Sequence, residues 1–396
     1  MHGRGHSHIM IHANLAPVNV ALIGCGNFAR WQHLPNLHRL PSANLSLVCD
    51  SNEQLAQEIA TRYGCAPSTN AEAIFADPQI EAVVLAVRDD LQASMCQQAL
   101  RSGKHVYVEK PVGINPDQII AVQETLEQSS ASLGVGFQKR CAPAYGKAKT
   151  LLDTDGGVRN LQLQMCDDAW RWAHGYELGS LIVHDVCHLF DLARWLCDSD
   201  IAMIMARRSR PDDDAILLEM SNGCVVTIMA SGHATMDRPK ERLDAISQRG
   251  GVSVEDFVEL RSYGYPGQAA LEHFAGATHP EHSPLPHYLL QDQGAQGLAS
   301  IRRIAWQLRE DLKNNTVAAH DIDQVTDFVN ATIPNFLRDQ GWMNAMDLFL
   351  KRIRDPDIGA NLAGIDDALA AATCAQAALH SINSGQPVYL NNFTGK

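Results

Sequence analysis

The sequence has no excess of basic residues, no apolar stretch long enough to span a membrane, and no hydrophobic region typical of a signal peptide. Asp and Glu outnumber Lys and Arg by 45 to 32, which gives a formal net charge of −13. An acidic chain offers no extended basic surface for a phosphate backbone or an anionic membrane. No run of about 18 apolar residues is present, and the N-terminus has no apolar core of the secretory type. We therefore expect neither nucleic acid nor a membrane as a partner.

The sequence also lacks any pairing pattern among its cysteines. The ten cysteines stand singly along the chain, with no C-x-x-C pair and no dense framework of the kind that small secreted domains need. We expect reduced thiols and a cytoplasmic protein. Four histidines cluster within the first dozen residues, where a disordered tail over residues 1–15 is the simpler prediction than a metal site.

The length and the apolar content favour two domains. A chain of 396 residues that is 45% apolar can build two cores. In the first half, short apolar runs end in turn residues and alternate with helix-like stretches, which is typical of a parallel sheet. The expected strands are 18–23, 45–49, 82–87, 105–108 and 132–137. We predict an α/β Rossmann domain over residues 16–142.

The second half shows a different pattern, with strand-like runs and few helices between them. These runs are 161–166, 201–207, 215–220, 225–231 and 242–247, and Asn222-Gly223 suits a hairpin turn. We predict an α+β domain over residues 143–396 with a largely antiparallel open sheet. Residues 264–355 form an expected helical insertion or lid, followed by a helix over 364–384 and a short strand over 387–390.

A glycine-rich turn follows the first predicted strand. Gly24, Gly26 and Ala29 form the pattern G-x-G-x-x-A, with Asn27 and Phe28 between them. In this pattern the first glycine allows the tight turn, the second lets backbone approach a pyrophosphate, and the small third residue lets helix and strand pack closely. The free N–H groups at the following helix start attract the anion. We predict a dinucleotide site made by these five residues.

Asp50 closes the second predicted strand, where a carboxylate can accept hydrogen bonds from the adenosine ribose. A negative charge there repels a 2′-phosphate, and neither Arg nor Lys follows in Ser51-Asn52. The sequence therefore favours NAD(H) over NADP(H) as the cofactor.

The chain resembles the Gfo/Idh/MocA family of sugar and inositol oxidoreductases. The resemblance begins at Glu109-Lys110-Pro111 and extends over the glycine-rich turn, 99–111, 136–140, the segment that ends at Asp191, and the C-terminal end; only 264–355 has no counterpart. It implies a Rossmann domain joined to an open-sheet domain that often oligomerises through the sheet. We therefore expect a homodimer or homotetramer and a small sugar or polyol substrate.

The resemblance also implies two catalytic residues, whose chemistry is suitable. Oxidation of a secondary alcohol needs a hydride acceptor, a base for the hydroxyl proton, and positive charge near the developing alkoxide. Lys110 follows a Rossmann strand at the edge where ligands bind and can supply the charge or relay a proton. His188 matches the family's proton-exchanging histidine, and imidazole has a suitable pKa. Glu109 is expected to order the loop or the nicotinamide ribose region.

Departures from the family pattern lie close to His188. Many members carry Asp four residues before the histidine and Gly two before it, whereas this chain has His184 and Val186, with Asp185 between them. His184, Asp185 and His188 can be interpreted as metal ligands, but the sequence indicates no further ligand. We expect no metal site and include His184 and Asp185 among the substrate-binding residues.

Further candidate residues come from other loops. Val87 and Arg88 follow the third strand, where the family has T-P-x-x-x-H; Arg88 can contact the cofactor or an anionic substrate group, or pair with Asp89 or Asp90 at the surface. Arg140 is a predicted substrate contact. The remaining candidates are Trp170, Arg171 and Trp172, which can stack on a sugar and bind an anion or can pack in the core.

These residues predict NAD-dependent hydride transfer at a carbinol or keto carbon of a sugar, amino sugar, nucleotide sugar or cyclitol. Two alternatives remain open at this point. One is an NAD-dependent glycosidase that uses transient oxidation to drive elimination. The other is a binding or regulatory protein without turnover, because a fold does not fix a function.

Overall fold

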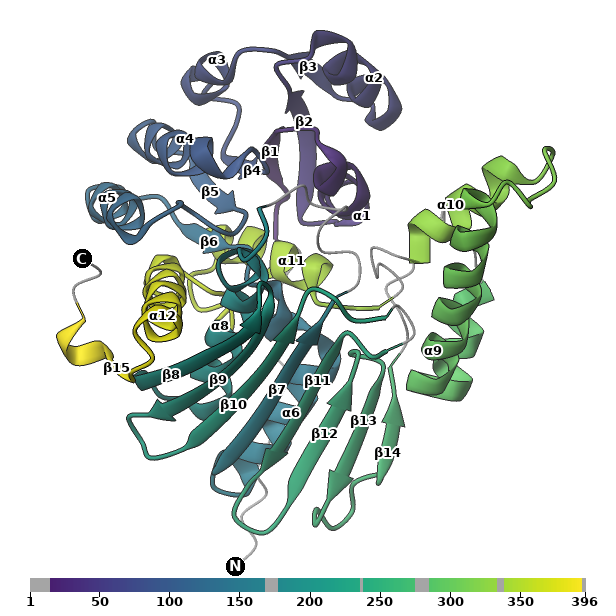
Figure 1. Cartoon of the computed structure of the whole chain (residues 1–396). Helices are drawn as coiled ribbons and strands as arrows, with labels where there is room; N and C mark the ends of the chain where they lie inside the picture. Colours follow the sequence, from purple (N-terminus) through teal and green to yellow (C-terminus); the bar gives the residue numbers. More distant parts are fainter. Residues whose placement is uncertain (1–14, 168–176, 236–237, 275–284, 333–337, 394–396) are drawn as a thin grey trace, which may run out of the picture.

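The computed structural model describes residues 15–167, 177–235, 238–274, 285–332 and 338–393. Two sheets dominate the molecule (Figure 1), one of six strands and one of nine. The predicted tail at residues 1–15 falls outside the described residues except for its last position.

The first sheet is parallel and lies in the order β3-β2-β1-β4-β5-β6. Its strands are β1 (Val18–Ile23), β2 (Ala43–Cys49), β3 (Ala66–Ser68), β4 (Ala82–Leu85), β5 (His105–Val108) and β6 (Leu133–Val135). The associated helices are η1 (Ala29–His33), α1 (Leu34–Arg39), α2 (Glu53–Tyr63), α3 (Ala71–Ala76), α4 (Asp89–Arg101) and α5 (Pro116–Glu127).

Alternate residues of β1 show why this sheet needs helices on both faces. Val20 and Leu22 are buried in one apolar cluster, together with residues of α1 and α2. Ala21 and Ile23 are buried in another, with residues of α4 and α5. Both faces are apolar, as expected for a doubly wound sheet. The Rossmann prediction is confirmed, but the sequence missed β3, which has three partly exposed residues and therefore no apolar run.

The second sheet is mixed and mostly antiparallel, in the order β14-β13-β12-β11-β7-β10-β9-β8-β15, and only β7 and β10 run parallel. Its strands are β7 (Asn160–Cys166), β8 (Ile201–Arg210), β9 (Asp213–Met220), β10 (Val225–Ser231), β11 (Glu241–Ile246), β12 (Gly251–Glu255), β13 (Glu259–Tyr263), β14 (Leu271–His273) and β15 (Val388–Tyr389). Gly223 has a φ of 87° in the predicted turn between β9 and β10.

Helices cover one face of this sheet and leave the other open (Figure 1). The covering helices are α6 (Pro143–Thr154), α8 (Cys187–Cys197) and α12 (Ile365–Ser384), and the short helices η2 (Gln138–Cys141), η3 (Ile182–Val186) and η4 (Leu390–Asn392) lie nearby in sequence. On β9 and β10, buried and exposed residues alternate, which is the pattern of a sheet with one solvated face. The predicted fold class is confirmed.

The range 264–355, predicted from the sequence as one insertion, is divided in space. Helices α9 (Leu285–Lys313, kinked at Gly294) and α10 (Ile322–Thr332) form a pair at the β14 side of the second sheet (Figure 1). Helix α11 (Trp342–Arg354) instead packs on the first sheet, where Met346 and Phe349 join the cluster of Val20 and Leu22. The periodicity of a helix does not say which sheet its apolar face covers.

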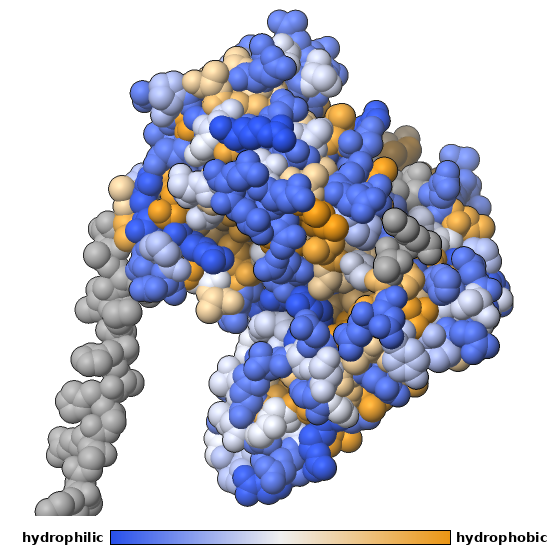
Figure 2. All heavy atoms as spheres, turned by 90° about the vertical axis from the view of Figure 1, so that its left-hand side faces the viewer, coloured by the Kyte–Doolittle hydropathy of each residue, from blue (hydrophilic) through white to orange (hydrophobic). Residues whose placement is uncertain are grey.

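Polar residues dominate one face of the molecular surface. The face seen in Figure 2 carries mostly hydrophilic residues, with apolar residues in separate small groups. Among the described residues, no helix combines the length and the apolar content needed to cross a membrane.

Candidate active site

The glycine-rich turn connects β1 to η1 at the carboxyl edge of the first sheet. Gly24 has a φ of 94°, and a Cβ atom there would lie 2.3 Å from the carbonyl oxygen of Ala86. Only glycine therefore fits. Gly26 faces open space, with no atom within 4 Å of an added Cβ. This opening leaves room for a phosphate to approach the backbone, which the predicted dinucleotide site requires.

The three residues after Gly26 have different surroundings. Asn27 is exposed and its side chain accepts a hydrogen bond of 2.5 Å from Arg30. Phe28 packs edge-on against His33 and Trp342. Ala29 is buried where the helix meets the sheet. Asn27 thus lies at the open side of the turn, whereas Phe28 and Ala29 support it from within.

Asp50 follows β2 and is bonded to the glycine-rich turn. Its Oδ2 atom accepts a hydrogen bond of 2.8 Å from the backbone N–H of Cys25, and its Oδ1 atom accepts one of 2.9 Å from Asn52. Each carboxylate oxygen has two lone pairs, so Asp50 can hold the turn and still accept bonds from a ribose. These residues fit a dinucleotide: an open backbone approach at Gly26 lies beside an acceptor at Asp50.

Glu109 and Lys110 follow β5, and the Lys110–Pro111 peptide bond is cis. Glu109 is buried and pairs with His33, with 2.9 Å between Oε1 and Nε2. Its other oxygen lies 3.3 Å from the backbone nitrogen of Lys110, and an added Cβ at Gly136 would collide with it. Glu109 therefore orders the loop, and its partner His33 was not among the residues expected from the sequence.

Lys110, after β5, contacts the turn of helix that precedes His188. The Nζ atom of Lys110 donates a hydrogen bond of 2.5 Å to the carbonyl oxygen of His184, one turn before His188. The His188 ring packs edge-on against Phe137 and is 4% exposed, and its Nδ1 atom has no hydrogen-bond partner among the described residues. Burial, with the nearby Lys139 and Lys110 charges, lowers the pKa of His188 well below its ordinary value. The ring is neutral at pH 7.

Asp185 faces this same region. Its Oδ2 atom lies 3.6 Å from Lys240 Nζ but accepts no hydrogen bond from the described residues. Burial would raise the pKa of Asp185, but Lys240, Lys110 and Lys139 together hold it well below its ordinary value. Asp185 is therefore an ionised acceptor with free hydrogen-bonding capacity next to His188.

His184 points elsewhere. Its Nδ1 atom lies 3.3 Å from the Oδ2 atom of Asp89, at the start of α4 on the first sheet. Among the described residues, no group of three or more His, Cys, Asp or Glu side chains is arranged to hold a metal ion.

Arg88 and Val87 stand between β4 and α4. Arg88 forms a two-bond pair with Asp90, with distances of 3.0 and 2.5 Å, and its side chain is 80% exposed. The surface-pair alternative is thus present in the structure. Val87 is half-buried beside the first glycine of the turn. The expected stacking residues Trp170, Arg171 and Trp172 lie outside the described residues.

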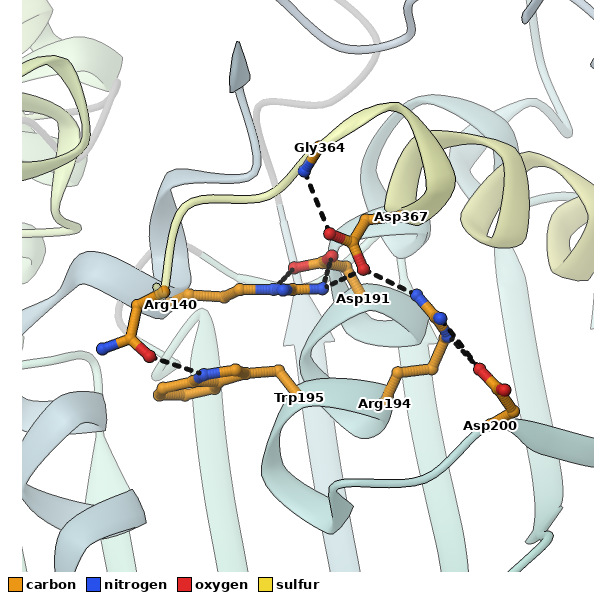
Figure 3. Close-up of polar contacts among 8 residues, drawn as sticks. Arg140, Asp191, Arg194, Trp195, Asp200, Gly364 and Asp367 are labelled. Carbon is orange, nitrogen blue, oxygen red and sulfur yellow. Dashed lines mark hydrogen bonds and ion pairs between the residues drawn. The ribbon is translucent and has the colours of Figure 1, made fainter. Parts of the chain in front are cut away.

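Arg140 does not lie open to the site, contrary to the expectation that it contacts substrate. Its guanidinium donates to both carboxylate oxygens of Asp191, at 2.8 and 2.5 Å, and to Asp367 at 2.8 Å (Figure 3). Arg194 joins the same network through Asp367 and Asp200. Arg140 is 7% exposed, so its charge serves to join η2, α8 and α12. A sequence motif locates an arginine but not its partners.

The sequence did not single out two lysines that the fold brings to the site, the buried Lys139 and the half-buried Lys240. Lys139 pairs with Glu241 at 2.7 Å, and Lys240 pairs with Asp167 at 2.6 Å. Lys240 precedes β11 and Glu241 begins it, more than fifty residues after His188. Only the adjacency of Lys139 to Arg140 gave any local signal, and nothing near Lys240 distinguishes it from a surface lysine.

Two family models match the chain. The oxidoreductase family with an NAD-binding Rossmann fold, GFO_IDH_MocA, matches residues 18–137, and the GFO/IDH/MocA C-terminal domain matches residues 154–253. An oxidoreductase of Formosa agariphila is 32% identical over 151 residues, 37% of this chain and 47% of that protein. An inositol 2-dehydrogenase of Rhizobium meliloti is 25% identical over 254 residues, 60% of this chain and 76% of that protein. The chain thus matches between about half and three quarters of these relatives' lengths.

Solved structures agree with the fold. An oxidoreductase from Agrobacterium radiobacter, in complex with NAD+, L-tartaric acid and magnesium, superposes with a TM-score of 0.71 at 16% identity and covers 96% of this chain and 99% of its own. A scyllo-inositol dehydrogenase from Lactobacillus casei, with bound NAD(H) and scyllo-inositol, gives 0.66 at 15% identity, with 95% and 100% covered. With both family models matched in order along one chain, this protein belongs to the Gfo/Idh/MocA family of oxidoreductases and carries its NAD-binding Rossmann domain.

Proposed function

We propose that this protein transfers a hydride between NAD(H) and a carbinol or keto carbon of a cyclitol or sugar. The observation that carries the proposal is the contact of Lys110 with the carbonyl of His184, one helical turn before a neutral, buried His188. The names of several relatives, inositol 2-dehydrogenases of 25 to 29% identity, support the substrate class. When bound, the nicotinamide ring accepts or gives the hydride.

His188 is the proposed acid and base. In the oxidation direction the substrate hydroxyl donates a hydrogen bond to the neutral imidazole, which takes the proton as the carbonyl forms. The structure supports this role because the Nδ1 atom of His188 is buried without a hydrogen-bond partner among the described residues. A buried acceptor left unpaired costs about 1–3 kcal/mol, and a substrate hydroxyl would remove that cost.

Lys110 is the proposed electrostatic residue. Its ammonium group carries three N–H donors, one of which is used by the carbonyl of His184. A second can point at the substrate oxygen and stabilise the negative charge that develops as the proton leaves. The bond to His184 fixes the lysine chain against the helix that carries His188, so the two groups approach the same oxygen.

We propose NAD(H) as the working cofactor in preference to NADP(H). Asp50 places a carboxylate at the end of β2, hydrogen-bonded to the glycine-rich turn, where a 2′-phosphate would meet a negative charge. Arg88, the nearest arginine after β4, is engaged by Asp90.

The experiment that tests the function is a substrate panel. Purified protein and its His188→Ala variant are mixed with NAD+ and inositols, free sugars, amino sugars, nucleotide sugars and uronates, and NADH absorbance is followed. His188-dependent NADH formation on one class supports the proposal. Release of a free sugar from a glycoside without net NADH would replace it with the glycosidase alternative. Binding of NAD+ without any turnover would favour a regulatory protein.

We also propose that two or four copies associate through the open face of the second sheet. Exposed apolar side chains point outward from five of the nine strands of this face; they are Leu217, Met229, Ile246, Tyr263 and Leu271. Exposed apolar side chains on an open sheet face support association with another copy. Sedimentation analysis should give a dimer or tetramer, and Ile246→Lys with Met229→Lys should shift it toward monomer. A wild-type monomer at micromolar concentration would contradict this.

A further inference from the structure

The acid next to His188 is not where the family pattern places it. The position four residues before His188 holds His184, and its ring turns toward Asp89 on the first sheet, with Nδ1 and Oδ2 3.3 Å apart. The next residue, Asp185, turns toward the lysines at the junction of the two sheets. The carboxylate in the site is therefore displaced by one residue along the chain, and other contacts must hold it in place.

Those contacts come from the second sheet. Lys240 Nζ lies 3.6 Å from Oδ2 of Asp185 and 2.6 Å from Oδ2 of Asp167. The three side chains are 16%, 13% and 4% exposed, in the order Lys240, Asp185, Asp167. The backbone at Lys240 is held in place, because the backbone N–H of Cys166 donates a hydrogen bond of 2.7 Å to the carbonyl oxygen of Lys240.

The surrounding charges make Lys240 the strongest partner of Asp185. Asp185 is faced by Lys240 before β11, Lys110 after β5, Lys139 on η2 and His188 on α8, and Lys240 contributes most to lowering its pKa. Lys139 is already paired with Glu241 at 2.7 Å, and Lys110 donates to the carbonyl of His184. Without Lys240, Asp185 would lose, in a mostly buried site, the cation that contributes most to keeping it ionised, which is costly.

We propose that Lys240 is a positioning residue of the active site: it holds the Asp185 carboxylate beside Lys110 and His188, where Asp185 accepts a hydrogen bond from a substrate hydroxyl. This inference rests on the proposed function. The unpartnered Oδ2 atom of Asp185 is the acceptor that the substrate would use. Lys240, next to β11 of the second sheet, would in this way set the geometry of Asp185 beside Lys110 and His188.

The test compares Lys240→Met with Lys240→Arg, and with Lys147→Met as a matched control. Among the described residues, Lys147 pairs with Glu272 at 3.9 Å, and both side chains are more than a third exposed. On the substrate found with the panel, Lys240→Met should lower kcat at least tenfold and raise KM. The acidic limb of its kcat/KM profile should move up by about one pH unit or more, because Asp185 loses its main cation. Lys240→Arg should restore most activity, and Lys147→Met should match wild type.

Each outcome decides a separate point. A folded Lys240→Met protein with wild-type kcat, KM and pH profile overturns the role of Lys240. If this variant does not fold, Lys240→Gln is used, which keeps a polar chain without the charge and is expected to show the same shifted limb; an unshifted limb there overturns the role as well. If wild-type protein shows no His188-dependent turnover on any substrate, the proposed function itself fails, before Lys240 is tested.

Discussion

Two clusters of charged residues lie where the two sheets meet, and they are built differently. In the first cluster, Arg140 and Arg194 are surrounded by three carboxylates at hydrogen-bonding distance (Figure 3). Burial would raise the pKa of Asp367, but Arg140 and the N–H of Gly364 lower it below its ordinary value. In the second cluster, Asp185 and His188 each keep a buried polar atom without a hydrogen-bond partner among the described residues.

The difference teaches how to separate structural from functional charges. A buried polar group is normally satisfied by protein, and an unsatisfied one costs free energy. In the cluster of Arg140 the charges are paired with one another, as in a network that stabilises the fold. The cluster of Lys110 and His188 is incomplete without a ligand, which is the expected condition of a site that binds substrate hydroxyls.

The largest effect is expected from a substitution in the second cluster that leaves the first cluster intact. Lys110→Ala should lower kcat by about 10²–10⁴-fold, because the charge opposite the developing alkoxide is lost. NAD+ affinity should stay within a factor of about three, since the glycine-rich turn is untouched. Steady-state kinetics measure the loss of kcat, and calorimetric titration measures the affinity for NAD+. Full activity of both Lys110→Ala and His188→Ala would remove the assignment of this site.

The next largest effect is expected from a substitution in the first cluster. Arg140→Met should lower the free energy of unfolding by about 3–5 kcal/mol, because Asp191 would be left buried without its bidentate cation. At temperatures where the variant stays folded, its KM should be close to wild type. Urea unfolding measures the loss, with Lys149→Met, which removes a surface pair with Asp153, as a control expected to cost under about 1 kcal/mol. An increase in KM without loss of stability would show that Arg140 contacts the substrate.

A smaller effect concerns cofactor choice at the edge of the first sheet. Asp50→Asn keeps an acceptor for the N–H of Cys25 but removes the charge, so the ratio of NAD+ to NADP+ in kcat/KM should fall about tenfold or more. Asp50→Ala also loses the bond to the turn and should weaken both cofactors. An unchanged ratio in the asparagine variant would show that Asp50 serves only the turn.

The smallest effect is a pH dependence of stability. The folded-state pKa of His188 lies well below its ordinary value, so the unfolded chain binds a proton that the folded chain does not. Stability is therefore lost as the pH falls through the unfolded-state pKa of about 6.5, at up to about 1.4 kcal/mol per pH unit. Between pH 7.5 and 5.5, wild type should lose more stability in urea titrations than His188→Gln. Parallel losses in the two proteins would place His188 in a solvated position.

Local sequence determined the dinucleotide half almost completely. The strands at 18–23 and 105–108 and the turn at Gly24 and Gly26 could be predicted from apolar periodicity and glycine placement, since each depends on neighbours in the chain. The candidate residues Lys110 and His188 followed instead from the resemblance to the family.

The tertiary structure decided what depends on residues far apart in the chain. It placed α11 on the first sheet, bound Arg140 to Asp367 across 227 positions, and brought Lys240 to Asp185. It also turned His184 away to Asp89. Each of these outcomes depends on which charges and apolar faces meet after the sheets have packed, and the order of residues around one lysine or arginine carries no record of its partners.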